Sequence, residues 1–396
     1  MRILTTADRL SLRGGLERVH LEVNRSLAQR GHVIDLLYSA PGEATDSWFS
    51  FVRRSAPVRC VARRQLRGAP SLVGTLIRAA AFGARSRPDV IYSPRHTHLV
   101  HALTVGAVSR APVVCHLHSP PPRAQLTRAQ RVVLGRVRRF VAVSNFTAAQ
   151  WVSAGIPEDR VSVVHNGVDI RRFQPLTEGE LGATRRQLGI DPATRVVLYA
   201  GRLDPRKGID VLLEAWKLLS TELDGARLVV AGAPSEYLGE RGDALLEGWR
   251  HRCDPATTVL LGHTPDPIAV YEAADLVVVP SVWTDPFPLA VLEAMAVGVP
   301  VVASRVGGIP EALGARFRSH LVEPGRPAEL AAKVRELIDW RTRSPRLGHA
   351  CRDHVLTHFT LDRMVERLEA LFVRAVLHHK SMASTFEPRR GSNTRQ

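Results

Sequence analysis

The sequence predicts an α/β fold of two doubly wound domains, each built on a parallel sheet with helices on both faces. The chain has 396 residues, 45% of them hydrophobic, which is too long for one ordinary core but enough to fill two. Short apolar runs alternate with amphipathic stretches, as they do in chains that form parallel sheets. A polar stretch with several glycines and prolines interrupts this alternation near the middle and indicates a domain boundary.

The first domain is expected over residues 1–173. Gly14 and Gly15 open its first helix, and Gly31 ends that helix after Arg30, as glycine commonly does. The expected strands are apolar along most of their length, which is typical of strands buried on both faces of a sheet. We expect them at residues 2–7, 32–37, 89–94, 112–119, 139–144 and 161–167.

The second half repeats this alternation after the polar stretch 174–194, which we expect to be a linker. The second domain follows over residues 195–360, and a long last helix is expected over about 361–378. The tail 381–396 has low hydrophobicity and is expected to be disordered. The strands of the second domain are expected at residues 195–203, 226–234, 257–264, 276–281, 300–306 and 319–325.

Composition narrows the classes of protein that the chain can belong to. No run of 18 or more apolar residues occurs, so we expect no helix that spans a membrane. The first fifteen residues lack the long apolar segment of a secretory signal. The four cysteines (Cys60, Cys115, Cys253 and Cys351) have no C-x-x-C spacing, so we expect neither a disulfide framework nor a zinc site. A reducing cytoplasm fits these features best.

The positive charge lies entirely in the first half. Residues 1–175 contain 26 arginines, no lysine and 10 acidic residues, whereas the remaining residues are balanced in charge. Nine arginines and no acid lie between Asp46 and Asp89. This asymmetry indicates an anionic partner, which can be a membrane surface, a phosphorylated acceptor or nucleic acid. The alternative is a GC-rich genome that encodes arginine for lysine, which explains the residue type but not its confinement to one half.

Ligands of open parallel sheets bind beyond the carboxyl ends of the strands, so the loops after the strands are the first candidates for a site. The loop AGRLDPRKGID follows the first strand of the second domain and places Arg202 and Lys207 at a helix entrance. Two cations beside the free N–H groups of a helix N-terminus can clamp a diphosphate. The alternative is a basic loop exposed to solvent.

The stretch SVWTDPFPLAVLEAMAVGVP contains two acids, Asp285 and Glu293, among apolar residues, where an unpaired carboxylate is unfavourable. We expect a strand, the loop TDPFP and then a helix. The free N–H groups near Pro288 and Leu289 then form a second anion site beside Phe287. Glu293 is placed to accept hydrogen bonds from a ribose diol, and Asp285 from sugar hydroxyls. The alternative is a loop cap and an exposed helix residue.

Weaker signals come from three other loops. Gly14 and Gly15 allow close approach of the backbone to phosphate. The segment HLHS puts His116 and His118 on one face of a strand, with His118 nearer the carboxyl end, where ligands bind. A ligand role and a structural role of His118 both stay open. The third loop lies at the end of the expected strand 257–264, near Gly262 and His263.

These segments together resemble the family-four retaining glycosyltransferases of the GT-B fold, and the resemblance covers nearly the whole chain. It is carried by RGGLERVHLEVNRSLAQRGHVIDLL, HLHS, VAVS, VHNGVD, AGRLDPRKGID and DPFPLAVLEAMAVGVPVVASRVGGIPE. The resemblance implies that Arg202 and Lys207 hold the donor diphosphate and that Glu293 binds the nucleotide ribose. Asp285 stands where the family has glutamate beside the donor sugar, so its carboxylate reaches one methylene less far.

The resemblance further implies that Gly15 approaches the diphosphate and that His118 lies beside the donor sugar or the acceptor hydroxyl. The backbone near Gly262 and His263 would contact the nucleotide base. The first domain would bind the acceptor, the second the donor, and the last helix would cross back onto the first domain. The expected reaction is the transfer of a hexosyl unit from a UDP- or GDP-sugar to a hydroxyl with retention of configuration. No DxD metal motif is present, so we expect neither a metal nor another cofactor to be required.

For the acceptor, the charged first half favours an anionic or lipid-linked molecule, as in the synthesis of envelope glycolipids and polysaccharides. Residues 48–68 and 129–140 would then contact the anionic inner face of the cell membrane peripherally. A soluble natural-product acceptor is the alternative. Other classes left open are a sugar-nucleotide epimerase, a phosphorylase that uses pyridoxal phosphate, and a basic protein that binds nucleic acid or membrane through an inactive transferase fold. No nucleic-acid-binding module is recognised, so no nucleic-acid partner is expected.

Overall fold

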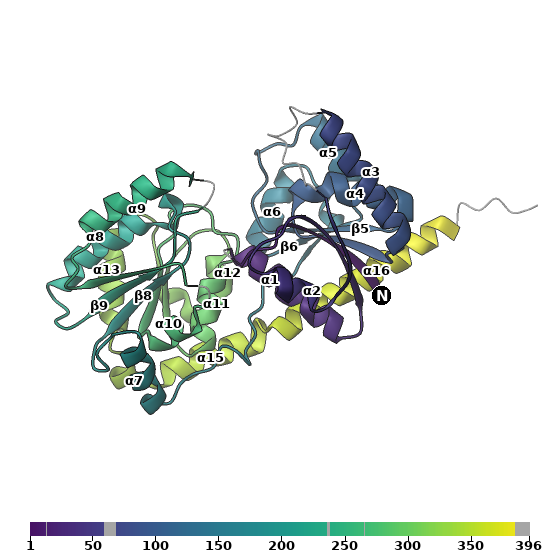
Figure 1. The fold of residues 1–396 in the computed structure, drawn as a ribbon. Helices are drawn as coiled ribbons and strands as arrows, with labels where there is room; N and C mark the ends of the chain where they lie inside the picture. Colours follow the sequence, from purple (N-terminus) through teal and green to yellow (C-terminus); the bar gives the residue numbers. More distant parts are fainter. Residues whose placement is uncertain (13, 59–68, 236–237, 265, 385–396) are drawn as a thin grey trace, which may run out of the picture.

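Two parallel sheets lie side by side in the computed structural model, which describes residues 1–12, 14–58, 69–235, 238–264 and 266–384 (Figure 1). Within these ranges the first sheet has seven strands and the second has six, and every pairing is parallel. The predicted fold class is therefore confirmed. The last part of the expected tail, residues 385–396, and part of the basic stretch 48–68 lie outside the described residues.

The first sheet has the strand order β3-β2-β1-β4-β5-β6-β7. Six of its strands fall on predicted runs. β3 was missed because it is an edge strand whose residues are mostly exposed, so it lacks an apolar run. The strands are β1 (Arg2–Arg9), β2 (Val33–Ala40), β3 (Val52–Pro57), β4 (Val90–Ser93), β5 (Val113–Leu117), β6 (Arg139–Ala142) and β7 (Val161–Val163).

Helices cover both faces of this sheet because successive strand residues point to opposite sides. In β1, Ile3 packs with α1 and α16, whereas Leu4 packs in the cluster formed with α3, α4, α5 and α6. A short helix, α2, precedes the edge strand β3. These helices are α1 (Gly15–Gln29), α2 (Thr45–Phe49), α3 (Ala69–Ser86), α4 (Leu99–Ser109), α5 (Arg128–Gly135), α6 (Asn145–Ser153) and α16 (Leu361–Ser384).

The second sheet has the order β10-β9-β8-β11-β12-β13. Its strands are β8 (Val196–Ala200), β9 (Arg227–Ala231), β10 (Thr258–Gly262), β11 (Leu276–Val279), β12 (Val301–Ser304) and β13 (Leu321–Val322). Its helices are α7 (Glu178–Gln187), α8 (Ile209–Ser220), α9 (Glu240–Arg252), α10 (Ile268–Ala273), α11 (Leu289–Ala296), α12 (Ile309–Leu313), α13 (Pro327–Leu337), α14 (Trp340–Arg343) and α15 (Arg346–His358).

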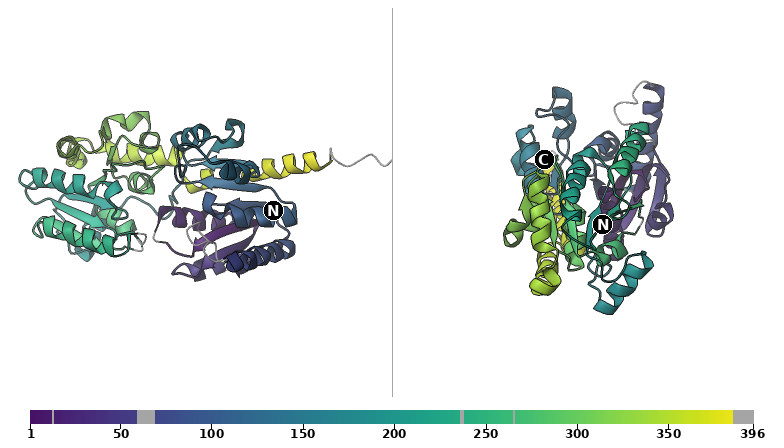
Figure 2. Two further views of the ribbon diagram at one scale, coloured as in Figure 1. Left: turned by 90° about the horizontal axis from the view of Figure 1, so that it is seen from above. Right: turned by 90° about the vertical axis from the view of Figure 1, so that its left-hand side faces the viewer.

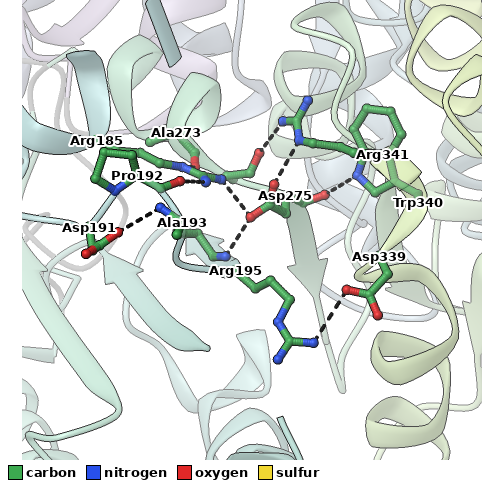
Figure 3. A network of polar contacts seen from close by, with 12 residues as sticks. Arg185, Asp191, Pro192, Ala193, Arg195, Ala273, Asp275, Asp339, Trp340 and Arg341 are labelled. Atoms are coloured by element: carbon green, nitrogen blue, oxygen red, sulfur yellow. Dashed lines mark hydrogen bonds and ion pairs between the residues drawn. The ribbon is translucent and has the colours of Figure 1, made fainter. Parts of the chain in front are cut away.

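The stretch 174–194, predicted to be a linker, instead contains helix α7, which packs against α10. Arg185 of α7 is buried and donates to the Asp275 carboxylate at 2.6 Å, and Arg341 donates to the other oxygen at 2.8 Å (Figure 3). The backbone N–H of Val196 at the start of β8 also donates to Asp275. The buried acid thus fixes α7 to the second sheet, because an unpaired carboxylate there would be costly.

The last helix crosses from the second domain to the first, as predicted (Figures 1 and 2). Its buried face, which includes Val365, Leu368 and Phe372, packs with residues of β1, β4 and α1. At the crossing, Val168 and Thr360 pair as a parallel bridge, so the two connecting segments lie side by side. The helix continues to Ser384, so its last turn replaces the start of the expected disordered tail.

No helix in the described part of the chain combines the length and the apolar composition that a membrane span requires.

Candidate active site

The loops after β8 and β11 meet at the centre of the second sheet. These strands are neighbours there although they are not consecutive in the chain, which makes their carboxyl ends the topological switch point where such sheets bind ligands. Gly208 has φ +77°, and a Cβ at this position would lie 1.9 Å from the Pro280 carbonyl oxygen. The N–H groups of Val282 and Trp283 both donate to the Arg206 carbonyl. Glycine and these hydrogen bonds therefore hold the two loops together.

The two loops bring Lys207 and Asp285 into contact. The Lys207 ammonium donates to the Asp285 carboxylate, with Nζ 2.5 Å from Oδ2, and the Ser281 hydroxyl lies 3.3 Å from the same oxygen. Asp285 is only 5% exposed, whereas Arg202 is exposed and forms no ion pair among the described residues. The site therefore contains a cation that already faces a carboxylate and a second cation that is available to a ligand.

The backbone at Asp285 rests on the two glycines that precede α12. Gly307 has φ +59°, and a Cβ there would lie 2.0 Å from the Asp285 carbonyl oxygen. The same carbonyl accepts a hydrogen bond from Gly308 N–H at 2.8 Å. The segment VGGIP thus needs glycine for close approach, and it fixes the direction in which the Asp285 side chain leaves the loop.

Glu293 lies in the second turn of α11 and is almost completely buried, at 3% exposure. The Tyr271 hydroxyl donates to its Oε2 at 2.8 Å, and Arg18 of the first domain forms an ion pair with its Oε1 at 3.2 Å. Burial, followed by the nearby Glu293 carboxylate, raises the pKa of Tyr271, so its hydroxyl remains a donor at neutral pH. Glu293 is thus a charged group held from two sides.

The start of α1 faces the start of α11 across the interdomain space. A Cβ on Gly15 would lie 3.3 Å from Cδ1 of Leu289, the first residue of α11 after its N-cap, Pro288. The ring of Phe287 is buried and stacks on His165, and its carbonyl accepts from Asn166. Two helix N-termini with free N–H groups therefore converge near the predicted diphosphate position, with Phe287 contributing to the domain interface.

His118 follows the carboxyl end of β5, as predicted, and its Nε2 atom is buried without a hydrogen-bond partner among the described residues. Its ring lies 4.0 Å from that of His116, so the two side chains share one face. Burial, then the neighbouring His116, lowers the pKa of His118 well below its ordinary value. His118 is therefore neutral at physiological pH and presents an unused polar atom.

Gly262 and His263 lie at the end of β10, two strands away from β8, and both are exposed. The structure thus brings Lys207, Asp285 and Leu289, which faces Gly15, to the centre of the second sheet. The residues expected to contact the base lie at the edge of that sheet. The residues that sequence reasoning missed are Arg18, Tyr271 and Glu311. Two of them occur inside quoted motifs, RGGLER and VGGIPE, but nothing in those strings shows which atom they face.

Glu311 of α12 forms a contact between the domains. Its carboxylate accepts hydrogen bonds from the backbone N–H groups of Asn145 and Phe146, both at 2.8 Å, and lies 3.1 Å from Nε2 of His165. Burial alone would raise the pKa of Glu311, but the hydrogen bonds from His165 and from these N–H groups outweigh it and lower that pKa. A carboxylate of the second domain thus caps helix α6 of the first.

Replacing Glu311 by glutamine is expected to favour separation of the domains by about 1–2 kcal/mol, since charge-assisted hydrogen bonds to a helix N-terminus are lost. Small-angle scattering should show a larger radius of gyration than for the wild type. Glu323→Gln is the matched control, because Glu323 is exposed and pairs with Arg305 within its own domain. Equal scattering curves for wild type and Glu311→Gln would contradict the prediction.

No group of three or more His, Cys, Asp or Glu side chains that could hold a metal ion occurs within the residues that the structure describes.

Comparison with known proteins gives the same picture. The sequence model of Glycosyltransferase Family 4 matches residues 13–172, and that of Glycosyl transferases group 1 matches residues 182–353. The chain is 34% identical over 287 residues to the D-inositol 3-phosphate glycosyltransferase of Mycolicibacterium gilvum, a match that covers 72% of this chain and 62% of that relative. It is 35% identical over 311 residues to D-inositol 3-phosphate glycosyltransferase 1 of Catenulispora acidiphila, covering 76% and 70%.

Solved structures share the fold at lower identity. HepE of Anabaena, crystallised in complex with UDP-glucose, superposes with a TM-score of 0.80 at 20% identity, covering 94% of this chain and 99% of that one. The sucrose-phosphate synthase of Thermosynechococcus elongatus gives 0.74 at 20% identity, covering 96% and 100%. On the family models, the identities to the relatives and the two facing parallel-sheet domains, the chain belongs to the family-four glycosyltransferases and has the GT-B fold.

Proposed function

We propose that the protein is a retaining glycosyltransferase that moves a hexosyl unit from a UDP- or GDP-sugar to an acceptor hydroxyl. The observation that carries the proposal is the contact of Lys207 with Asp285 at the switch point of the second sheet. The buried Glu293 lies on α11, the helix that follows the Asp285 loop. The UDP-glucose bound by HepE supports a nucleotide-sugar donor. Retention of configuration is part of the proposal and is supported by the resemblance to the retaining family.

In this reaction the second domain holds the donor. Lys207, Arg202 and the N-terminus of α8 neutralise the diphosphate as it leaves, which is the charge that develops in the transition state. Asp285 accepts hydrogen bonds from sugar hydroxyls, so Lys207 turns from its carboxylate toward the phosphates when the donor binds. Glu293 accepts from the ribose diol, with Tyr271 fixing one of its oxygens.

His118 supplies a neutral imidazole beside the donor sugar or the acceptor hydroxyl, where its unpaired Nε2 can take part in a hydrogen bond. Closure of the domains excludes water and protects the donor from hydrolysis. Because the sequence lacks a DxD motif, the chain's own cations supply the charge that a metal ion would otherwise provide. Loss of turnover on chelation, restored by a divalent ion, would overturn this last point.

The acceptor is proposed to be anionic and to bind in the first domain. A small cavity at the carboxyl ends of β1 and β4 is lined by Arg9, Trp48 and Arg95, among others. Asp8 and Glu17 also line this cavity, and Glu17 pairs with Arg95, so the lining is balanced in charge. The anionic character of the acceptor therefore rests on the excess of arginine in residues 1–175. The phosphorylated polyol in the relatives' names favours a soluble acceptor over the lipid-linked one expected from charge alone. Product formation with a phosphorylated polyol, compared with a lipid-linked acceptor, separates these two sources.

A lipid-linked acceptor in envelope polysaccharide synthesis would require membrane contact, for which one surface is suited. Helices α3, α4 and α5 contain no acidic residue and expose Val73, Ile77 and Val132 beside arginines such as Arg78. If the protein contacts the inner face of the cell membrane, it should bind vesicles rich in phosphatidylglycerol, and Ile77→Glu should weaken this binding. Leu218→Glu on α8 is the control, and equal partitioning onto neutral vesicles would remove the membrane role.

The deciding experiment is a panel of UDP, GDP and ADP tested for thermal stabilisation of the wild type and of Glu293→Ala. A ligand at 100 times its dissociation constant should stabilise the folded state by about 2.7 kcal/mol. Stabilisation by one nucleotide, lost in Glu293→Ala and kept in Glu323→Ala, is the expected result. If none of the three stabilises the wild type, the proposed function fails, and binding to nucleic acid through the basic first domain becomes the reading to test.

A further inference from the structure

Arg18 lies in the first domain, yet its charge partner lies in the second. Its Nη1 is 3.2 Å from Oε1 of Glu293, and the side chains are 31% and 5% exposed. The Arg18 guanidinium therefore reaches across the interdomain space to the carboxylate that is proposed to bind the ribose. The other oxygen of Glu293 is already held by Tyr271 within the second domain.

Both ends of this ion pair are mounted on packed helices. Helix α1 is anchored by Val19, Val23 and Leu27, which are buried in the core of the first domain. On α11, every residue from Val291 to Ala296 is buried. The contact of Gly15 with Leu289 lies one turn before the ion pair on both helices. The Arg18–Glu293 distance is therefore set by how the two domains meet rather than by freely moving side chains.

The electrostatics show why this contact matters. Glu293 is nearly buried and Tyr271 is neutral, so an opposite charge beside the carboxylate offsets the cost of removing it from water. Arg18 is the cation that the described residues place within ion-pair distance of it. The pKa of Arg18 is raised, chiefly by the Glu293 carboxylate, which indicates a strong mutual interaction.

We propose that Arg18 is a positioning residue of the donor site, supplied by the first domain, which holds Glu293 in place for the ribose of the nucleotide. The inference rests on the proposed function. Its consequence is that the ribose contact is complete only when the domains meet, so nucleotide binding and domain closure favour each other. If Arg18 positions Glu293, replacing Arg18 should weaken only ligands that contain a ribose. If Arg18 binds phosphate directly, the replacement should weaken every ligand that contains a diphosphate.

The test compares the binding of UDP and GDP with that of inorganic pyrophosphate, which has no ribose, by calorimetric titration. Arg18→Ala is expected to weaken the nucleotide about tenfold and to leave pyrophosphate unchanged, whereas Arg18→Lys should retain most of the affinity. In a Glu293→Gln background, Arg18→Ala should cause no further loss. Arg25→Ala is the matched control, because Arg25 lies on the same helix at 33% exposure and pairs with Glu22.

Each other outcome decides against a specific statement. If Arg18→Ala binds the nucleotide as the wild type does, the role of Arg18 is wrong and the proposed function stands. If pyrophosphate is weakened equally, Arg18 binds phosphate and does not position Glu293. Additive losses in the double variant would likewise overturn the positioning role. If the wild type binds no nucleoside diphosphate, the proposed function itself fails. Unchanged melting temperatures show that the variants are folded. If Arg18→Ala does not fold, the comparison of Arg18→Lys with the wild type keeps the test valid.

Discussion

Replacing Lys207 by alanine is expected to lower the kcat of sugar transfer by about 100- to 1000-fold, the range seen when one preorganised group that stabilises transition-state charge is removed. Lys207 lies at the switch point and its ammonium is already directed into the site by Asp285. The loss should appear in kcat more than in donor KM, because the charge on the departing diphosphate grows as the bond to the sugar breaks. Steady-state kinetics with the nucleotide-sugar identified by thermal stabilisation measures it.

A second variant separates this chemical loss from a structural one. Removing Lys207 leaves the buried Asp285 carboxylate with the Ser281 hydroxyl at 3.3 Å, which is an incomplete replacement. Lys207→Ala combined with Asp285→Asn removes that uncompensated charge, so the melting temperature should recover while activity stays low. Activity of Lys207→Ala within tenfold of the wild type would show that Lys207 does not act on the diphosphate.

Much of the fold could be predicted because buried parallel strands carry a strong local signal. Runs such as 276–281 are apolar on both faces, and β11 lies within it. Predicted strands extend past the observed ends because loop residues near the site are buried as well; Ser281, for example, is 1% exposed. Edge strand β3 and helix α7 gave no such signal, since β3 is mostly exposed and α7 is polar, with the Arg185–Asp275 ion pair linking α7 to the second sheet.

The site could be predicted only where its residues follow one another in a loop. Lys207 and Asp285 were expected from helix entrances and strand ends, and the sheet order brings them together. Arg18 and Glu311 act across the interface between the domains, and their partners are more than 140 residues away in the chain. No periodicity or spacing encodes such a pairing, because it depends on how two separately folded sheets face each other.

Acidification is expected to destabilise the first domain well before its carboxylates are protonated. His20, His98 and His116 are buried at the carboxyl ends of β1, β4 and β5, with 4% exposure or less. Burial lowers the pKa of His98 to about 4 and that of His116 to about 3, and burial, then neighbouring His98, lowers that of His20 well below 6.5. Within the part of the chain that the structure describes, Nε2 of His116 has no hydrogen-bond partner, so a proton there would be buried without an acceptor.

The sign follows from proton counting. Below pH 6.5 the unfolded chain binds protons that the folded chain cannot, so stability is complete above pH 6.5 and falls until the folded-state pKa values near 4 to 3 are reached. At pH 5.5 each such histidine lowers the free energy of unfolding by about 1 kcal/mol, so the three together remove a few kcal/mol from a typical total of about 5–15 kcal/mol. Carboxylates with lowered pKa values, such as Glu311, lose their contribution to stability only at lower pH, as the pH falls through about 4.5.

Urea unfolding followed from pH 8 to pH 5 measures the slope of unfolding free energy against pH, and the slope is the informative quantity. Each buried histidine adds about 1.4 kcal/mol per pH unit to that slope below pH 6, whatever its contribution to packing. His116→Gln should therefore reduce the slope by the share of one proton even if it also lowers stability at pH 8. A slope near zero between pH 6 and pH 5, or one unchanged in His116→Gln, would show that these histidines are protonated within the fold, and a neutral His118 in the donor site would then be untenable.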